Sequence, residues 1–131
     1  ILIHRAISSK PRNKNHALMQ EMDAAVRYFH ENYNKPISIE AYAAENHMSV
    51  SWFIRSFKEY TDATPAQYLL SIRISNAQTL LETTSYNITE IAEIVGYDNP
   101  LYFSRLFKKQ NGMSPSDFRK HLQKDPTQTN T

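Results

Sequence analysis

The segment WFIRSFKE at residues 52–59 returns fifty residues later as YFSRLFKK at residues 102–109. A second pair of segments follows at the same offset, TPAQY at residues 64–68 and SPSDF at residues 114–118. Repetition at a fixed period indicates that one supersecondary unit occurs more than once. The sequence therefore predicts two copies of the same small fold.

Each copy also has a short apolar segment upstream of the repeated one. IEAYA at residues 39–43 corresponds to ITEIA at residues 88–92, with the offset shifted by one residue. Both copies therefore contain a short helix, a tight turn, a second helix and a third helix that begins at a Thr-Pro or Ser-Pro pair. A short helix, a turn and a longer helix make up the helix-turn-helix motif. We expect two helix-turn-helix units.

Helical spacing of apolar residues, together with start and stop signals, divides the chain into seven helices and no convincing strand. Gly is rare, with 2 of 131 residues, and Pro falls mostly between the apolar stretches, which favours helices. The predicted fold is all-α, with two helix-turn-helix subdomains joined by a long connecting helix. The expected helices cover residues 16–33, 38–46, 49–60, 65–82, 88–95, 99 or 100 to 111, and 115–123.

The predicted domain boundaries follow from this order of helices. Residues 1–15 are interpreted as a linker or disordered N-terminal segment, and residues 125–131 as a disordered tail. The connecting helix spans roughly 27 Å, which approaches the roughly 34 Å between successive major-groove faces of DNA. The double helix-turn-helix domain covers residues 16–124, with a first unit at about 16–64, the connecting helix at 65–82 and a second unit at about 83–124.

The second helix of each copy has an inner and an outer face. Phe53 and Phe57 lie four residues apart, as do Phe103 and Phe107, and we expect both pairs to pack inward. The opposite face carries Ser51, Ile54, Arg55 and Lys58 in the first copy, and Leu101, Ser104, Arg105 and Lys108 in the second.

This outer pattern suits double-stranded DNA. A mid-helix arginine can donate two hydrogen bonds to guanine in the major groove, and a lysine one turn later can meet a phosphate. Contact with a thymine methyl group would explain the apolar Ile54 and Leu101 on this face. The predicted base contacts are Ser51, Ile54, Arg55, Leu101, Ser104 and Arg105, and the predicted phosphate contacts are Lys58, Lys108 and Lys109.

Composition argues against several other classes of protein. The chain has no cysteine, which excludes disulfides, thiolate metal sites and cysteine nucleophiles and suits a reducing cytoplasm. Five dispersed histidines give no ligand spacing, so no metal or other cofactor is expected. No nucleophile–base pair, Gly-rich phosphate loop or carboxylate cluster supports an enzyme. No apolar run reaches the length of roughly 18 residues that spans a membrane.

Net charge by itself is a weak indicator of nucleic-acid binding. It is +2, and residues 1–35 hold six Lys and Arg against three Asp and Glu, whereas residues 36–124 hold nine of each. A strongly basic total is the usual footprint of a DNA-binding domain. The hypothesis therefore rests on where the charges lie and not on their sum.

The segment from about residue 37 to residue 119 resembles the DNA-binding domain of AraC/XylS-type transcription regulators. The most specific stretch is IAEIVGYDNPLYFSRLFKK at residues 91–109, followed by GMSP at 112–115 and FR at 118–119. The resemblance implies seven helices, two helix-turn-helix units and binding to promoter DNA, usually to activate transcription. It also implies a separate N-terminal sensor or dimerisation domain, and it points to RNA polymerase as a further partner. Within the expected connecting helix, Arg73, Ala77, Leu80 and Leu81 fall where the family has them.

Two positions depart from the family pattern. The first copy has Asn46-His47 where the second has Val95-Gly96 at the turn. Asn and His tolerate a left-handed turn, so we expect the turn to survive while the core contact of Val is lost. Leu101 stands where the family commonly has a small polar residue, which makes its base contact less secure than that of Arg105.

Three further residues are interpreted from their positions. Arg73 is expected to be an internal ion-pair or packing residue and not a DNA ligand. Trp52 and Tyr102 lie between the inner and outer faces, so we expect each to pack against the domain with one edge near DNA.

A helical protein-interaction module that binds a partner helix is the alternative function. The Arg and Lys residues on both outer faces favour DNA, since a groove for a partner helix would be more apolar. The DNA hypothesis also requires that the two basic faces lie on the same side of the molecule.

Overall fold

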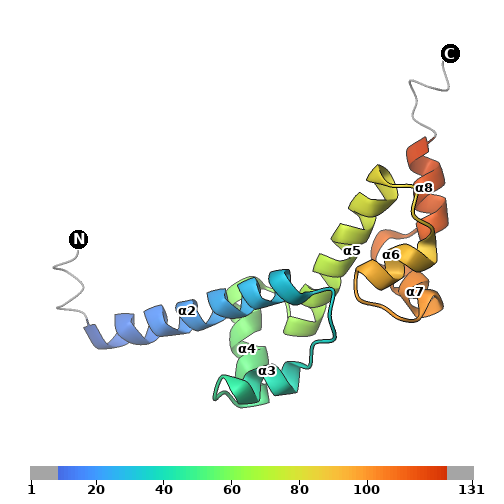
Figure 1. The fold of residues 1–131 in the computed structure, drawn as a ribbon. Coiled ribbons are helices and arrows are strands. Elements are labelled where there is room, and N and C mark those ends of the chain that lie inside the picture. Colours follow the sequence, from blue (N-terminus) through green and yellow to red (C-terminus); the bar gives the residue numbers. More distant parts are fainter. Residues whose placement is uncertain (1–8, 124–131) are drawn as a thin grey trace. The chain divides into compact units, whose positions relative to one another are not determined.

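The computed structural model describes residues 9–123, with side chains from residue 16 onward (Figure 1). Every regular element within this range is a helix, which confirms the predicted all-α fold with seven helices. The helices are α2 (Ser9–Asn32), α3 (Ile39–Glu45), α4 (Val50–Thr61), α5 (Pro65–Thr83), α6 (Ile88–Ile94), α7 (Pro100–Asn111) and α8 (Pro115–Gln123).

α2 begins seven residues earlier than the sequence indicates. The sequence assigns residues 9–15 to a linker, whereas the structure includes them in the helix. Pro11 falls in the first turn, where proline removes no helical hydrogen bond. Apolar spacing marks only a stretch of helix with regularly placed apolar residues, and residues 9–15 have no such spacing. Residues 1–8 and the predicted tail 125–131 lie outside the described residues.

The described chain divides into two compact units, and neither is contiguous in sequence. Unit 1 comprises residues 9–32 and Ile37–Leu69, whereas unit 2 comprises Tyr33–Pro36 and residues 70–123. The connecting helix α5 therefore belongs to unit 1 as far as Leu69 and to unit 2 beyond it.

Aromatic side chains form the core of unit 1. Phe29 of α2 and Phe53 and Phe57 of α4 are fully buried, as predicted for the α4 pair. The rings of Phe29 and Phe57 are centred 5.5 Å apart, and those of Tyr42 and Phe53 are centred 5.3 Å apart. Tilted rings at such distances attract each other beyond the effect of their burial alone. This cluster holds α4 with its inner face against α2 and α3.

Unit 2 buries a mixed aliphatic and aromatic core. Phe103 and Phe107 of α7 are fully buried, again as predicted, and Phe118 of α8 packs with its ring centre 5.5 Å from that of Phe107. α7 is therefore fixed by its inner face in the same manner as α4. The buried cluster consists of Ile74, Ala77, Leu81, Ile91, Ala92, Val95, Phe103 and Phe107.

Capping residues set where the helices begin. Ser49 is the N-cap of α4 and accepts a hydrogen bond from the Trp52 backbone N–H at 3.2 Å, as its position in the sequence suggests. Thr64 and Gln67 form a capping box at the predicted start of α5, with exchanged hydrogen bonds of 3.2 and 3.0 Å. Asn87 and Glu90 form a second such box at the start of α6, which the sequence analysis did not identify.

Both helix-turn-helix turns contain a residue in the left-handed conformation. His47 has φ of 62° in unit 1, and Gly96 has φ of 105° in unit 2. The expectation that His tolerates this turn is therefore confirmed. A Cβ atom at position 96 would lie 2.9 Å from the carbonyl oxygen of Tyr33, so backbone crowding at this turn also favours glycine. Asn46 is exposed where Val95 is buried, so the first copy does lack that core contact.

Candidate nucleic-acid interface

α4 presents its predicted outer face to solvent. Phe53 and Phe57 hold the opposite face in the core, so the orientation of the helix follows from its burial. Of the four residues predicted for this face, Ile54 is 37% exposed and the other three are also exposed. The helical spacing of i, i+3, i+4 and i+7 places them in one stripe. These residues are Ser51, Ile54, Arg55 and Lys58.

α7 presents a similar stripe with one difference. The side chain of Asn99 accepts hydrogen bonds from two backbone N–H groups of the first turn, which fixes the start of the helix. Leu101 is 71% exposed, whereas Ser104 is half-buried and so the least accessible of the predicted contacts. The three basic residues predicted for this helix, Arg105, Lys108 and Lys109, are all exposed.

Tyr102 is a candidate that the list of predicted contacts omits. Its side chain is 52% exposed, more than that of Ile54, and its ring is centred 6.0 Å from that of Tyr97 in an edge-on arrangement. The signal in the sequence is its spacing, because Tyr102, Arg105 and Lys109 lie three and seven residues apart and share a face. The corresponding Trp52 of α4 is half-buried.

The four arginines of α4, α5, α7 and α8 divide into two pairs. Arg73 and Arg119 donate hydrogen bonds to backbone carbonyl oxygens of unit 2. The internal packing role expected of Arg73 is therefore confirmed. Arg55 and Arg105 are exposed and form no hydrogen bond or ion pair with the part of the chain that the structure describes. Their guanidinium groups keep all five donors available to an external ligand.

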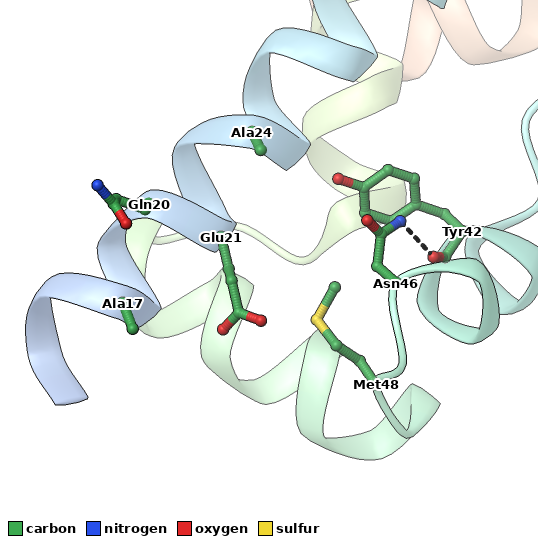
Figure 2. Close-up of a pocket in the computed structure, with 7 residues that line it drawn as sticks. All are labelled: Ala17, Gln20, Glu21, Ala24, Tyr42, Asn46 and Met48. Atoms are coloured by element: carbon green, nitrogen blue, oxygen red, sulfur yellow. Dashed lines mark hydrogen bonds between the residues drawn. The ribbon is translucent and has the colours of Figure 1, made fainter.

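Two shallow cavities lie in unit 1. One, of about 350 Å³, is bordered by α2 and by the end of α3, and Figure 2 shows Glu21 and Met48 directed into it. The other, of about 310 Å³, is lined by Glu21, His47, Met48, Ser49 and Trp52. The carboxylate of Glu21 lines both cavities and no Lys or Arg lines either one, so neither cavity is suited to hold a phosphate.

The described residues contain neither a membrane-spanning helix nor a metal-binding cluster. None of the described helices has the length and apolar character needed to cross a membrane. Among these same residues, no group of three or more His, Asp or Glu is arranged to hold a metal ion.

The chain matches a protein family described as a helix-turn-helix domain over residues 42–121. It is similar to the MmsAB operon regulatory protein of Pseudomonas aeruginosa, with 33% identity over 102 residues that cover 78% of this chain and 33% of that protein. It is also similar to the bifunctional transcriptional activator/DNA repair enzyme AdaA of Bacillus subtilis, with 30% identity over 118 residues that cover 90% of this chain and 56% of that protein. The chain thus spans about a third of the length of the first relative.

A solved structure supports the same relationship. The DNA-binding domain of AdpA, determined in complex with a target DNA, superposes with a TM-score of 0.75 and 31% sequence identity. The superposition covers 80% of this chain and 96% of that domain. The duplicated helix-turn-helix units and these similarities together show that the chain belongs to the AraC/XylS-type family of helix-turn-helix transcription regulators.

Proposed function

We propose that this chain is the DNA-binding domain of a transcription regulator, and that α4 and α7 each enter a major groove of promoter DNA. The observation that carries the proposal is the pair Arg55 and Arg105. They occupy matching positions in the two copies, are exposed, and make no hydrogen bond or ion pair within the described residues. A guanidinium group in this position can donate two hydrogen bonds to the O6 and N7 atoms of guanine.

The residues beside each arginine complete the proposed reading of bases. The hydroxyl groups of Ser51 and Ser104 can donate to or accept from base edges, and Ile54 and Leu101 offer apolar surface to thymine methyl groups. Ser104 is half-buried, so we propose that it contributes less to base recognition than Ser51 does. Specificity on this account comes from short contiguous sequences, one under each helix.

The lysines supply affinity that does not depend on base sequence. Lys58, Lys108 and Lys109 lie in the last turns of their helices and are exposed. Neutralising a phosphate with a lysine releases a condensed counterion, so each contact strengthens binding at low salt and makes it weaken as salt rises. We propose that these three residues contact the DNA backbone.

A further part of the proposal concerns the longer protein to which this chain would belong. Because the chain covers about a third of its first relative, we propose that it is one part of a longer regulator with a separate N-terminal sensor or dimerisation domain. That regulator would act in the cytoplasm at the nucleoid, with RNA polymerase as a further partner when it activates transcription. We assign no enzyme activity to this domain, since cysteine, the residue needed for thiolate alkyl transfer, is absent from the chain.

Selection of bound sites from random DNA duplexes tests the proposal directly. We expect two enriched half-sites about 10 base pairs apart, the spacing at which two recognition helices would enter successive major grooves. Binding to the selected duplex should then weaken steeply between two salt concentrations in a gel-shift assay. A doubly substituted chain, Arg55→Ala with Arg105→Ala, is the matched control. No enrichment, or binding that is indifferent to salt, would favour the alternative of a protein-interaction module.

A further inference from the structure

Arg73 of α5 contacts the segment that follows α2. Its Nε atom donates a hydrogen bond to the carbonyl oxygen of Tyr33 at 2.8 Å, and its Nη2 atom donates to that of Lys35 at 3.0 Å. These two bonds use the fork of donors that only arginine offers. The segment Tyr33–Pro36 is thereby joined to unit 2, although α2 itself belongs to unit 1.

The same guanidinium group also contacts the turn before α7. Its central carbon lies 5.0 Å from the centre of the Tyr97 ring, within the range of a cation–π attraction. Gly96 also lies close to this group, because a Cβ atom there would lie 3.1 Å from Arg73 Nε and 2.9 Å from the Tyr33 carbonyl oxygen. Burial raises the pKa of the Tyr97 hydroxyl, an effect that Arg73 partly opposes.

Tyr97 in turn contacts the recognition helix of unit 2. Its ring is centred 5.7 Å from that of Phe103 and 6.0 Å from that of Tyr102, and both residues belong to the first turn of α7. A continuous set of contacts therefore leads from the Tyr33 carbonyl through Arg73 and Tyr97 to α7.

Arg119 of α8 provides a natural comparison within the same unit. It donates hydrogen bonds to the carbonyl oxygens of Leu81, Thr84 and Tyr86, at 3.2, 3.0 and 2.6 Å. The Leu81 carbonyl lies in the last turn of α5, and those of Thr84 and Tyr86 lie in the connection between α5 and α6. Arg119 thus anchors a connection as Arg73 does, but within residues 16–123 its hydrogen bonds do not reach the turn before α7.

We propose that Arg73 is a positioning residue for DNA binding by α7, holding the Gly96-Tyr97 turn against the segment Tyr33–Pro36 so that α7 presents Arg105 correctly. This inference rests on the proposed function of α7. Loss of the Arg73 fork leaves two backbone carbonyls and the Tyr97 ring without their common partner. The turn then has more freedom, and the contacts that α7 makes with DNA weaken together.

Double-mutant cycles in the full 131-residue chain test this proposal, with affinity measured on the selected duplex. We expect Arg73→Ala to weaken binding roughly tenfold. Its effect should shrink in the Arg105→Ala background, because fewer α7 contacts remain to be lost. It should stay the same within about twofold in the Arg55→Ala background. Equal effects in both backgrounds would overturn the proposal.

Arg119→Ala is the matched control for a general loss of stability in unit 2. We expect this variant to lose stability but to show no selective coupling with Arg105→Ala. If it couples as strongly as Arg73→Ala, the effect is one of stability and not of positioning. Arg73→Lys, which retains one donor, serves if the alanine variant does not fold, and we expect it to show weaker coupling of the same kind.

Hydrogen exchange without DNA gives a readout that does not depend on the proposed function. The backbone N–H groups of Gly96 and Tyr97 donate to the carbonyl oxygens of Glu93 and Ala92, at 3.1 and 2.8 Å. Arg73→Ala should accelerate exchange at these two amides, whereas Arg119→Ala should not do so selectively. Unchanged exchange would refute the positioning role. Failure of the unsubstituted chain to bind any selected duplex would instead refute the proposed function.

Discussion

The two recognition helices share a pattern but differ in charge. The outer side of α4 carries Arg55 and Lys58 followed by the acidic Glu59, whereas α7 carries Arg105, Lys108 and Lys109. The first set sums to one positive charge and the second to three. Since phosphate attraction grows with each cation at the interface, we expect α7 to contribute more to affinity than α4. A duplicated fold thus need not give two equal DNA contacts.

The turns that precede α4 and α7 also differ, in how closely other parts of the chain surround them. His47 adopts the left-handed conformation at an exposed turn beside a shallow cavity, whereas Gly96 is enclosed by the Tyr33 carbonyl and by Arg73. An enclosed turn has fewer accessible arrangements than an open one. The comparison therefore suggests that α7 is held more rigidly than α4, and the following substitutions test it.

Removing a core ring should have the largest effect, and it should be equal in the two copies. Phe57→Ala and Phe107→Ala each delete a fully buried side chain, so we expect each to lower the free energy of unfolding by about 3–5 kcal/mol. Urea unfolding followed by circular dichroism measures the loss. Ile94→Ala, at a position that is 40% exposed, is the control with little effect. A loss below about 1 kcal/mol in one copy would mean that its core tolerates the cavity.

Substitutions at the two turns should change the free energy of unfolding differently. Gly96→Ala should lower the free energy of unfolding by roughly 2–3 kcal/mol, because the left-handed conformation is costly for alanine and its Cβ atom meets a backbone oxygen. His47→Gly should leave it nearly unchanged or raise it by up to about 1 kcal/mol. The same unfolding assay compares them. Equal losses at both positions would remove the distinction between an enclosed and an open turn.

The two arginines should each determine specificity at one base pair. We expect Arg105→Ala and Arg55→Ala to cost roughly 1–3 kcal/mol of binding free energy and to relax selection at a single position under the substituted helix. Repeating the site selection with each variant identifies that position. A uniform loss across all sequences would instead mark the residue as a phosphate contact.

Substitutions that change the charge of the outer faces should have the smallest effect on DNA binding. They test most directly the difference in charge between α4 and α7. Glu59→Lys makes α4 resemble α7, and we expect stronger binding with a salt dependence steeper by about one counterion. Lys108→Ala should weaken all sites similarly and reduce the salt dependence by about one. Binding titrations at several salt concentrations measure both slopes. If neither slope changes, charge on these faces is not what separates α4 from α7.

Most of the fold is predictable from sequence because its signals are local. Ser49, Thr64 and Asn99 cap helices through hydrogen bonds to residues two or three positions away. The Phe pairs of α4 and α7 lie four residues apart, and that spacing by itself identifies the buried face. Helix starts, inner faces and the duplication follow from such patterns. The start of α2 escaped the same reasoning, because its first residues show no apolar spacing.

The candidate site is predictable only in part, because exposure depends on neighbours that are distant in sequence. Helical spacing places Ser104 and Tyr102 on adjacent stripes, yet Ser104 is half-buried and Tyr102 is exposed. The edge-on contact with Tyr97 belongs to this arrangement, and no pattern within α7 specifies it.

The amino-acid sequence alone determined seven helices, several of their caps and the faces that turn inward, since each depends on residues within about one helical turn of each other. The duplication was visible in the sequence as a direct repeat. Tertiary structure decided how the arginines are used. Arg55, Arg73 and Arg105 are all helical arginines, but only Arg73 meets carbonyl oxygens about forty residues away, at Tyr33 and Lys35. Long-range contacts of this kind decide whether a guanidinium group forms hydrogen bonds within the fold or stays available to a binding partner. No local sequence pattern encodes them.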